Sequence, residues 1–578
     1  MKEQDIERHF YAIVVGSGPG GSTAVRELTE AGMDVLLLEA GPERSEAEFV
    51  RPEEEPGALG MDIIPRAKDM LIRGQVRQAC RAFFDGGVSP FMVNDLEDPY
   101  TTPLGQSYLW IRSKMLGGRM QTYGRVLQRM GNLDFKAASL DGYGEDWPIE
   151  YADLEPYYDR VEELVGVYGD KDGLDQPADG KYIGPGFLST IEKEFKAKVE
   201  TRWPERKVIS WRVQAPFEDR IPPGIAAARR TGRLVTRTNA VVSRITVNPR
   251  SGLASGAEFV DRVTKRRHRV FGDVVVLAAS TIESIRLLLN SGTTAFPDGL
   301  ANSSGLLGHY FMDQTTALCF ADVPDRPGSW DEDTAQPADS FHGRAGGILI
   351  PRFQNLDGRR TERYLRGFDY QGIGGRSPVP PDVPAVFGGD AMGEMLPRYD
   401  NYVGVSRRVK DKWGIPAPRI DCTLSANERM MTEDMMKAIR EMVEYAGYRI
   451  NFIGSTVGLD SSKVWPDFNP LQRQIFKVGI RMSQSLGAAI HECGGARMGS
   501  DPKKSVVNNV NQTWDIPNLF VTDASSFVTN GTVGPTLTIM ALTSRACKFI
   551  AEQHASGGLT RPTELAAVEQ PRKSPSKA

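Results

Sequence analysis

Six residues near the N-terminus have the types and spacing needed to hold a phosphate group. Gly16-Ser17-Gly18-Pro19-Gly20-Gly21 fits G-x-G-x-x-G, between a short apolar strand at 11–15 and a helical pattern at 22–31. A second apolar strand, at 35–38, ends at Glu39 and Ala40. In such a unit the glycines allow a tight turn and close backbone approach, the helix N-terminus faces phosphate, and the acidic residue accepts from ribose hydroxyls. The pattern predicts dinucleotide binding but does not choose between FAD and NAD.

Two further segments are compatible with this site. Gly117-Gly118, followed by Thr122 and Tyr123, suits a loop whose backbone closely approaches a ligand, although an ordinary loop explains it equally well. The apolar strand at 273–277 ends in Ala278-Ala279, and small residues at the carboxyl end of a strand leave room for a nucleotide. Core packing is an equal explanation for this strand.

Composition excludes several classes of protein. The chain has 578 residues, 40% of them apolar and 25% charged, which is typical of a globular protein and not of a disordered or collagen-like one. Its net charge of −4 gives no overall positive excess for nucleic acid or an anionic membrane. The densest basic run, at 265–269, is expected to be a solvated hairpin turn.

The remaining chain-wide features bear on compartment and metals. The sequence contains no run of about 18 apolar residues, so no membrane span is predicted. Residues 1–10 are charged and lack the apolar core of a secretory signal, so a cytoplasmic location is expected. Five scattered cysteines have no spacing typical of a disulfide framework, a metal site or an iron–sulfur cluster, so no metal is predicted.

The order of patterns predicts an α/β protein with two domains. Residues 1–311 form a Rossmann-like nucleotide domain, with excursions at about 43–103 and 150–230 that contribute to the substrate side. Residues 312–480 are richer in Pro, Gly and aromatic residues and form a substrate domain on an antiparallel sheet. Residues 481–554 return to the nucleotide domain, and the polar, proline-containing segment 555–578 is expected to be a disordered tail.

The C-terminal block is the most informative part of the chain. It contains His491-Glu492-Cys493-Gly494-Gly495-Ala496-Arg497-Met498-Gly499, a strand at 519–522 ending at Asp523-Ala524, and a helix beginning near Pro535-Thr536. With the N-terminal fingerprint, the Gly-Gly loop, Asp146-Trp147-Pro148 and the Ala278 strand, it makes the chain resemble the glucose–methanol–choline (GMC) oxidoreductases over residues 11–550.

The resemblance implies FAD as cofactor, in a nucleotide domain built from discontinuous pieces. It places Asp523 near the ribityl chain and pyrophosphate, Val242 on the adenine side, and Pro535 and Thr536 near the isoalloxazine. The family oxidises alcohols: a base removes the hydroxyl proton while a hydride passes to flavin N5. His491 matches the family's active-site histidine and has a suitable type of side chain for that base.

Two departures from the family pattern affect the expected site. Many members carry a second His or Asn where this chain has Gly534, and Asn530 is a weak candidate for that role, although it could equally shape a turn with Gly531. Some members bind flavin covalently through a histidine after the Gly-Gly pair, and here 119–123 contains none, so FAD is expected to be non-covalent.

The sequences at residues 413–416, 427–428 and 514–518 are similar to those of bacterial sugar-oxidising members of the family. These members include glucoside 3-dehydrogenases and pyranose or C-glycoside oxidases. We therefore expect oxidation of a ring secondary hydroxyl of a sugar or glycoside, C3 first, to a keto-sugar. The acceptor is oxygen or a quinone- or cytochrome-type acceptor. The alternatives are a non-sugar alcohol, or a flavoprotein lyase or other non-redox member. Some relatives pair with a small exported subunit, which leaves periplasmic export with such a partner as the alternative location.

Overall fold

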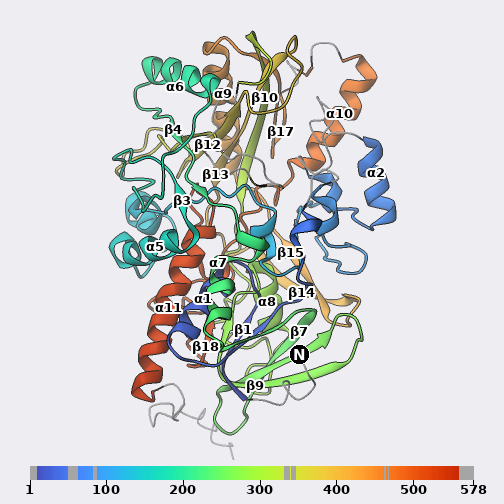
Figure 1. The fold of residues 1–578 in the computed structure, drawn as a ribbon, viewed down its shortest axis with the longest axis vertical. Coiled ribbons are helices and arrows are strands. Elements are labelled where there is room, and N and C mark those ends of the chain that lie inside the picture. Colours follow the sequence, from blue (N-terminus) through green and yellow to red (C-terminus); the bar gives the residue numbers. More distant parts are fainter. Residues whose placement is uncertain are drawn as a thin grey trace, which may run out of the picture.

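The computed structural model describes residues 9–49, 63–81, 87–330, 339, 341, 346–460, 464–465 and 468–558. The molecule is elongated, with one sheet toward each end of its long axis (Figure 1). This arrangement confirms the predicted α/β class with parallel and antiparallel sheets.

The first sheet contains the predicted nucleotide-binding strands. β1 (His9–Val15) lies between β2 (Val35–Leu38) and β9 (Arg267–Leu277), and β6 (Leu234–Arg237) extends the sheet beyond β2. β18 (Leu519–Val521) pairs with the last residues of β9, and all these pairings are parallel. Since β1, β2, β9 and β18 end at the same edge, the residues that follow them meet there.

The same sheet continues as an antiparallel meander. β7 (Ala240–Val247) pairs with β8 (Ala254–Asp261), which pairs with the first half of β9. Asn239 has a φ of +56°, in the left-handed region, and this turn separates β6 from β7. As a result β6 joins the parallel part of the sheet and β7 the antiparallel part.

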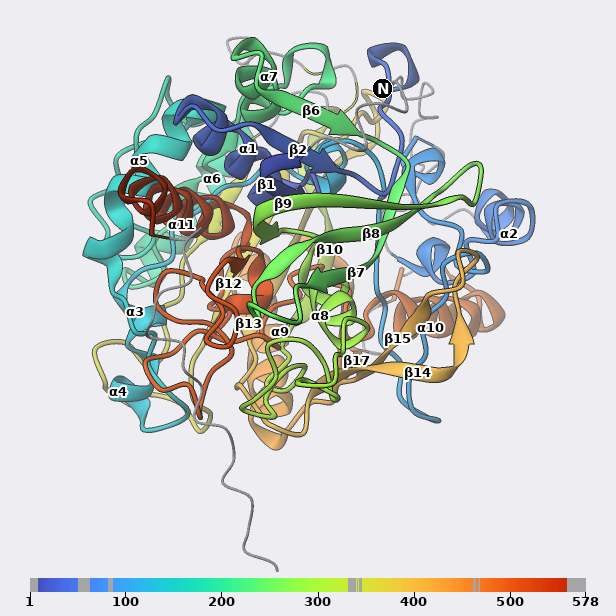
Figure 2. The same ribbon diagram turned by 90° about the horizontal axis from the view of Figure 1, so that it is seen from below.

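Helices cover the parallel sheet. α1 (Pro19–Glu30) packs against α11 (Thr536–Ser556) and α7 (Pro223–Arg230), while α11 also packs against α5 (Tyr151–Val165). Figure 2 shows α1, α5 and α11 together on one side of β1 and β9. α8 (Thr281–Leu289) follows β9 directly. α11 includes residues 555 and 556, which were expected in the tail, and residues 559–578 of that segment lie outside the described residues.

The second sheet is antiparallel, as predicted for the substrate side. Its order is β17 (Gly458–Leu459), β16 (Arg449–Ser455), β10 (Gln314–Pro327), β13 (Pro384–Glu394), β12 (Phe368–Gly374), β11 (Ile348–Ile350) and β4 (Ile209–Ser210). α9 (Ala426–Tyr445) packs on β10, β13 and β16. β4 comes from the 150–230 excursion, which therefore does contribute to this side.

Several smaller elements connect the two sheets. α6 (Thr190–Arg202) contacts α9, and β3 (Val167–Tyr168) pairs with β5 (Val213–Gln214). The hairpin of β14 (Tyr402–Lys410) and β15 (Pro416–Asp421) packs on α8. Thus part of the predicted 312–480 segment lies against the nucleotide side. α10 (Pro470–Ser483), α2 (Ile63–Ile72), α3 (Asn132–Phe135) and α4 (Ala137–Asp141) complete the main helices.

Short single-turn helices lie at Glu46–Glu48, Ser89–Phe91 and Glu218–Arg220, and three others, η3 (Gln78–Cys80), η5 (Gly118–Gln121) and η7 (Ala524–Ser526), lie near the site described below. Within the described ranges, no helix is long and apolar enough to cross a membrane. The same ranges contain no group of three or more His, Cys, Asp or Glu side chains that could hold a metal ion.

Trp147 links the chain's middle to its C-terminal block. Its side chain is buried between Phe135 and Phe527, and its indole Nε1–H donates to Thr529 Oγ1 at 2.7 Å. This packing explains the Asp146-Trp147-Pro148 motif as an anchor for the loop that precedes α11.

We predict that Trp147→Ala lowers the free energy of unfolding by about 3–5 kcal/mol, because it leaves a large cavity. Denaturant unfolding of the purified variant measures this. A matched Trp203→Ala variant removes a partly exposed indole at the end of α6 and should cost clearly less. If Trp147→Ala and Trp203→Ala lost equal amounts of unfolding free energy, Trp147 would not be an anchor.

Candidate active site

Gly16 and Gly21 allow close packing at the edge where the parallel strands end. A Cβ on Gly16 would lie 2.4 Å from the carbonyl oxygen of Ala278, and one on Gly21 would lie 1.8 Å from the carbonyl oxygen of Gly16. Gly20 would meet Ala278, Ile539 and Thr543 at 3.2–3.3 Å. The fingerprint turn, the end of β9 and the first turns of α11 therefore form one packed unit.

Gly18 borders open space within this packed edge. No heavy atom beyond its chain neighbours lies within 4 Å of a Cβ built on Gly18, and the nearest such atom to a Cβ on Gly118 is the Cα of Gly18, at 3.5 Å. Gly18 is also the N-cap of α1, and no side chain caps the helix there. Pro19 follows at the first helical position, where a proline is well tolerated. The free N–H groups of this helix end are suited to a pyrophosphate.

Glu39 lies at the end of β2 and faces the fingerprint. Its carboxylate accepts from Ser17 Oγ at 2.5 Å and from the Gly41 N–H at 2.8 Å, while the Gly117 N–H donates to Ser17 Oγ at 2.9 Å. Burial raises the pKa of Glu39. This network brings three predicted segments together: the fingerprint, the end of β2 and the Gly-Gly loop.

Asp523 holds the equivalent position after β18. Its carboxylate accepts from Ser284 Oγ at 2.5 Å and from the N–H and hydroxyl of Ser525, at 3.0 and 2.6 Å. Burial raises the pKa of Asp523. Ala524 follows in η7, and the Ala279 N–H donates to Ser284 Oγ at 3.2 Å. The α8 start and the C-terminal block thus meet at the same edge.

The predicted adenine side is formed by β2 and β7. The Ala240 N–H donates to the Glu39 carbonyl at 2.8 Å, which brings Ala40 and Val242 to neighbouring elements. A pocket of about 290 Å³ opens beside Pro42 and Asn239, and Trp413 also lines it. Glu39, Ala40 and Val242 do not line this pocket, so the position of the adenine stays a prediction.

Thr122 and Tyr123 follow η5 and are held by protein groups. Thr122 Oγ1 lies 3.3 Å from Ser113 Oγ, and the Tyr123 hydroxyl donates to Gln214 Oε1 at 2.5 Å. Any role of Thr122 and Tyr123 at the cofactor stays a prediction.

His491 is held by Gln314, the first residue of β10. Its Nδ1 lies 2.6 Å from Gln314 Oε1. The amide of Gln314 cannot turn round without losing contacts, because its Nε2 donates to the carbonyl oxygens of Gly531 and Val533, at 2.9 and 3.4 Å. Nδ1 must therefore carry the proton, and the lone pair is left on Nε2.

The surroundings keep the His491 ring neutral. Burial, followed by the positive charges of Arg119 and Arg81, lowers its pKa to about 3. Arg119 Nη1 in turn donates to Glu492 at 2.8 and 3.1 Å. A neutral imidazole with a free Nε2 is the form that can accept a proton.

The Nε2 atom faces Gly534. A Cβ on Gly534 would lie 3.3 Å from it, so a side chain at this position would stand directly beside the basic nitrogen. Gly534 immediately precedes Pro535, the N-cap of α11. The histidine is therefore linked, through residues 534 and 535, to the helix that packs on the fingerprint.

Asn530 contacts the strand that positions His491. Its Nδ2 donates to the carbonyl oxygen of Asp313 at 2.5 Å, and its Oδ1 is buried without a hydrogen-bond partner among the described residues. Asp313 also accepts from the His491 N–H at 3.2 Å, and burial with the nearby Glu492 raises its pKa to about 7. Because its donor is engaged, Asn530 supports the backbone beside Gln314.

The patterns did not single out three polar residues near His491. Gln314, Arg81 and Asp390 come from β10, from the end of η3 and from β13. Arg81 acts electrostatically on both His491 and Asp390, and burial raises the pKa of Asp390 to about 7. Asp390 Oδ1 is a buried acceptor with no hydrogen-bond partner among the described residues. No local motif marks these residues, so only the assembled sheet identifies them.

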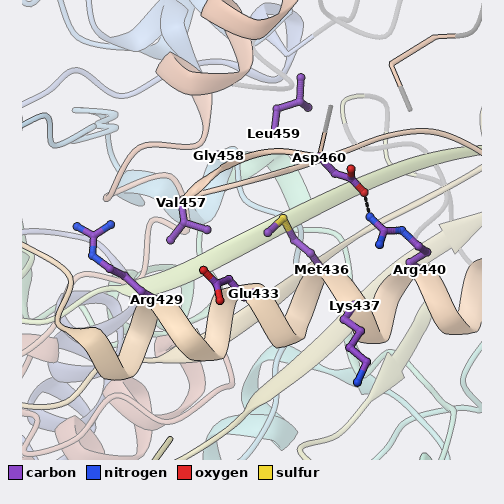
Figure 3. Close-up of a pocket in the computed structure, with 9 residues that line it drawn as sticks. All are labelled: Arg429, Glu433, Met436, Lys437, Arg440, Val457, Gly458, Leu459 and Asp460. Atoms are coloured by element: carbon purple, nitrogen blue, oxygen red, sulfur yellow. Dashed lines mark ion pairs between the residues drawn. The ribbon is translucent and has the colours of Figure 1, made fainter. Parts of the chain in front are cut away.

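A larger pocket elsewhere is unrelated to this cluster. It has a volume of about 480 Å³ and lies between α9 and the strand β17 (Figure 3). Arg440 and Asp460 form an ion pair at one end of it. None of the predicted site residues lines it.

The segment 514–518, one of those that suggested sugar oxidation, makes hydrogen bonds within the nucleotide side of the protein. The Asn518 side chain donates to the carbonyl oxygens of Ala254 and Asp273, at 2.8 and 2.6 Å, and Asp515 accepts from Ser303. Trp514 Nε1 donates to Ser505 Oγ at 2.9 Å. These residues stabilise the nucleotide side and do not contact His491.

Comparisons with known proteins agree with this geometry. Residues 397–543 match the GMC oxidoreductase family model. The chain is 28% identical to 2-methyl-1,2-propanediol dehydrogenase from Mycolicibacterium austroafricanum, over 94% of this chain and 95% of the relative. It is 26% identical to C-glycoside 3-oxidase from Arthrobacter globiformis, over 94% and 95%. These similarities support assignment of the chain to the GMC oxidoreductase family.

The fold agrees with that assignment. A solved structure of Aspergillus oryzae formate oxidase, described with its FAD modification, has a TM-score of 0.64 over 95% of this chain and 99% of that chain, at 15% identity. The family binds FAD, and the residues present fit it: open space in front of Gly18, an uncapped helix N-terminus, and Glu39 at the end of β2 beside the fingerprint. The protein is an FAD-dependent oxidoreductase.

We predict that Gly16→Val abolishes FAD loading, because its side chain would collide with the Ala278 carbonyl in the cradle. The ratio of visible flavin absorbance to protein absorbance after purification measures this. Gly124→Val is the matched control, since a Cβ there meets no heavy atom within 4 Å and its φ is not positive. A yellow Gly16→Val protein would contradict the assignment of the cradle.

Proposed function

We propose that this GMC oxidoreductase oxidises a ring secondary hydroxyl of a sugar or glycoside, with C3 favoured, to a keto-sugar. The observation that carries the proposal is the neutral His491, whose Nδ1 is bound to Gln314 and whose free Nε2 faces Gly534. Such a nitrogen accepts the hydroxyl proton of a substrate. When bound, FAD supplies the acceptor for the hydride from the carbinol carbon.

The residues around His491 have distinct roles in the proposal. Gln314 holds the tautomer, and Asn530 supports the Asp313 backbone that precedes Gln314. The positive charges of Arg81 and Arg119 disfavour the imidazolium and favour a substrate oxygen with partial negative charge. The cofactor is held by the Gly16–Gly21 turn, Glu39, Gly117-Gly118, Ala278-Ala279, Asp523 and the Pro535-Thr536 helix start.

Two observations favour a sugar. Gly534 leaves room beside Nε2, and a ring hydroxyl is flanked by carbon on both sides. Asp390 Oδ1 is a buried acceptor without a hydrogen-bond partner among the described residues, and a sugar hydroxyl would supply the missing donor. The similarity to C-glycoside 3-oxidase supports C3 in particular.

A non-sugar alcohol is the second candidate. It is favoured by the similarity to 2-methyl-1,2-propanediol dehydrogenase, which has the higher identity of the two relatives. In this proposal the electron acceptor is oxygen or a quinone- or cytochrome-type acceptor, and the FAD is bound non-covalently. The protein is located in the cytoplasm, or alternatively is exported with a small partner subunit.

The first prediction concerns substrate and base together. Under anaerobic conditions the visible flavin band of the wild type should bleach on adding glucose, a simple glucoside or a C-glycoside. His491→Ala should keep its FAD spectrum but bleach roughly 10²–10⁴-fold more slowly, because general-base assistance is lost. His268→Ala is the control, since its ring lies on β9 against Phe259 and should leave the rate unchanged.

Three outcomes would contradict the proposal in different ways. Bleaching only by a diol such as 2-methyl-1,2-propanediol would favour the second candidate. A flavin that no alcohol bleaches would indicate a non-redox member. Equal rates for the wild type and His491→Ala would remove His491 from the reaction.

The second prediction is a pH dependence. Because the pKa of His491 is lowered to about 3, the base stays neutral from pH 5 to 8, and kcat/KM should show no acid limb from it there. Gln314→Glu places a carboxylate at Nδ1, which favours the imidazolium and raises the pKa. The neutral base is then lost as pH falls through the raised pKa of His491. In Gln314→Glu the acid limb of kcat/KM should therefore lie at least about one pH unit above that of the wild type.

Gln314→Met is the matched variant, because it keeps the chain length and removes the hydrogen bond without adding charge. It should lower kcat without creating a new acid limb. An unchanged pH profile in Gln314→Glu would show that Gln314 does not position His491.

A further inference from the structure

An apolar stripe runs along the exposed face of α10. Leu471, Ile475, Val478 and Met482 are between 47% and 69% exposed. They are spaced by four, three and four residues, so they lie on one face of the helix. The buried residues Phe476 and Ile480 pack α10 onto the protein from the other face. The stripe therefore does not serve to attach the helix to its own fold.

A second set of exposed apolar residues lies beside it. Leu71 and Ile72 end α2, at 84% and 74% exposure, and Val76 follows them. η3 contacts both α2 and α10. Figures 1 and 2 both show α2 and α10 on the same side of the molecule. We call this combined area the α2–α10 face: Leu71, Ile72, Val76, Leu471, Ile475, Val478 and Met482.

The charge around the α2–α10 face is opposite to that of the whole protein. α10 contains Arg473, Lys477 and Arg481 and no acidic residue. Lys68, Arg73 and Arg77 lie in and after the C-terminal half of α2, where the one acid is Asp69, paired with Arg73 at 3.1 Å. The complete chain has a net charge of −4. Positive charge is thus concentrated where large apolar side chains are exposed.

We propose that the α2–α10 face docks on an anionic lipid bilayer, with the apolar stripe entering the acyl boundary and the basic side chains at the phosphate groups. Protruding aliphatic residues flanked by Lys and Arg are the composition of interfacial helices. Long basic side chains can lie along apolar surface while their charges reach the headgroups. The proposal does not depend on the substrate.

Charge also favours a bilayer over a second copy of the chain. In a two-fold interface the same patch faces itself, so the basic residues of one copy would oppose those of the other. An anionic bilayer meets the same residues with the opposite charge. The whole-chain charge alone gave no such indication, because it averages this local excess away.

The test is co-sedimentation of the purified, FAD-loaded protein with vesicles. The protein should bind vesicles of phosphatidylcholine with phosphatidylglycerol and bind pure phosphatidylcholine weakly. Binding should fall as salt is raised, because the Debye length shortens. Ile475→Ser with Val478→Ser should reduce partitioning at least about tenfold, and Arg481→Glu should reduce it on anionic vesicles with the stripe intact.

Val263→Ser is the matched control. Val263 is 75% exposed and lies among basic residues in the β8–β9 turn, but it is a single apolar residue. This variant should bind as the wild type does. All variants should keep the wild-type thermal midpoint and flavin absorbance, because the replaced side chains are exposed.

Three results would overturn the proposal. The first is wild-type protein that does not sediment with anionic vesicles, and the second is a stripe variant that sediments as well as the wild type. The third is a wild-type dimer in analytical ultracentrifugation that Ile475→Ser with Val478→Ser converts to a monomer, since a second copy would then cover the face.

Discussion

The hydrogen bond between Gln314 and His491 determines how this protein is organised for chemistry. It joins the first residue of a strand in the antiparallel sheet to a loop of the C-terminal block. The same glutamine holds the carbonyl oxygens of Gly531 and Val533, in the loop that leads to α11. Since α11 packs on the fingerprint helix α1, a single side chain couples the substrate side to the cofactor side.

Burial and charge around this bond act in the same direction. His491 is surrounded by protein and by two guanidinium groups, and both effects disfavour the imidazolium. A glutamine at Nδ1 adds no negative charge to offset them, unlike a carboxylate. The ring is thus neutral in the protein, which is the state that the proposed role of His491 as base requires.

The sequence identifies those candidate site residues that lie close together in the chain. The Gly16–Gly21 turn, Glu39 and the Ala278 strand end are recognisable because backbone approach and strand order constrain a few adjacent residues. Gln314, Arg81 and Asp390 could not be found this way. They are separated from His491 by roughly 100 to 400 residues, and only the pairing of β10 with β13 and the position of η3 bring them near it.

Two other residues show why local patterns were incomplete. Asn239 has a positive φ, which sends β6 and β7 to different parts of the sheet. Asn530 was a weak catalytic candidate by its place in the sequence, and its donor is used by the Asp313 carbonyl. Neither the turn at Asn239 nor the contact of Asn530 is visible in a local pattern, and a role of Asn530 toward the substrate stays a prediction.

The most direct test of this account is the protonation state of His491 in the holoenzyme. ¹⁵N NMR of histidine-labelled protein, with His491→Ala used to assign the signal, reports which ring nitrogen carries the proton. The account predicts a neutral ring protonated at Nδ1, unchanged from pH 8 down to about pH 5. A ring protonated at Nε2, or an imidazolium at pH 7, would contradict it.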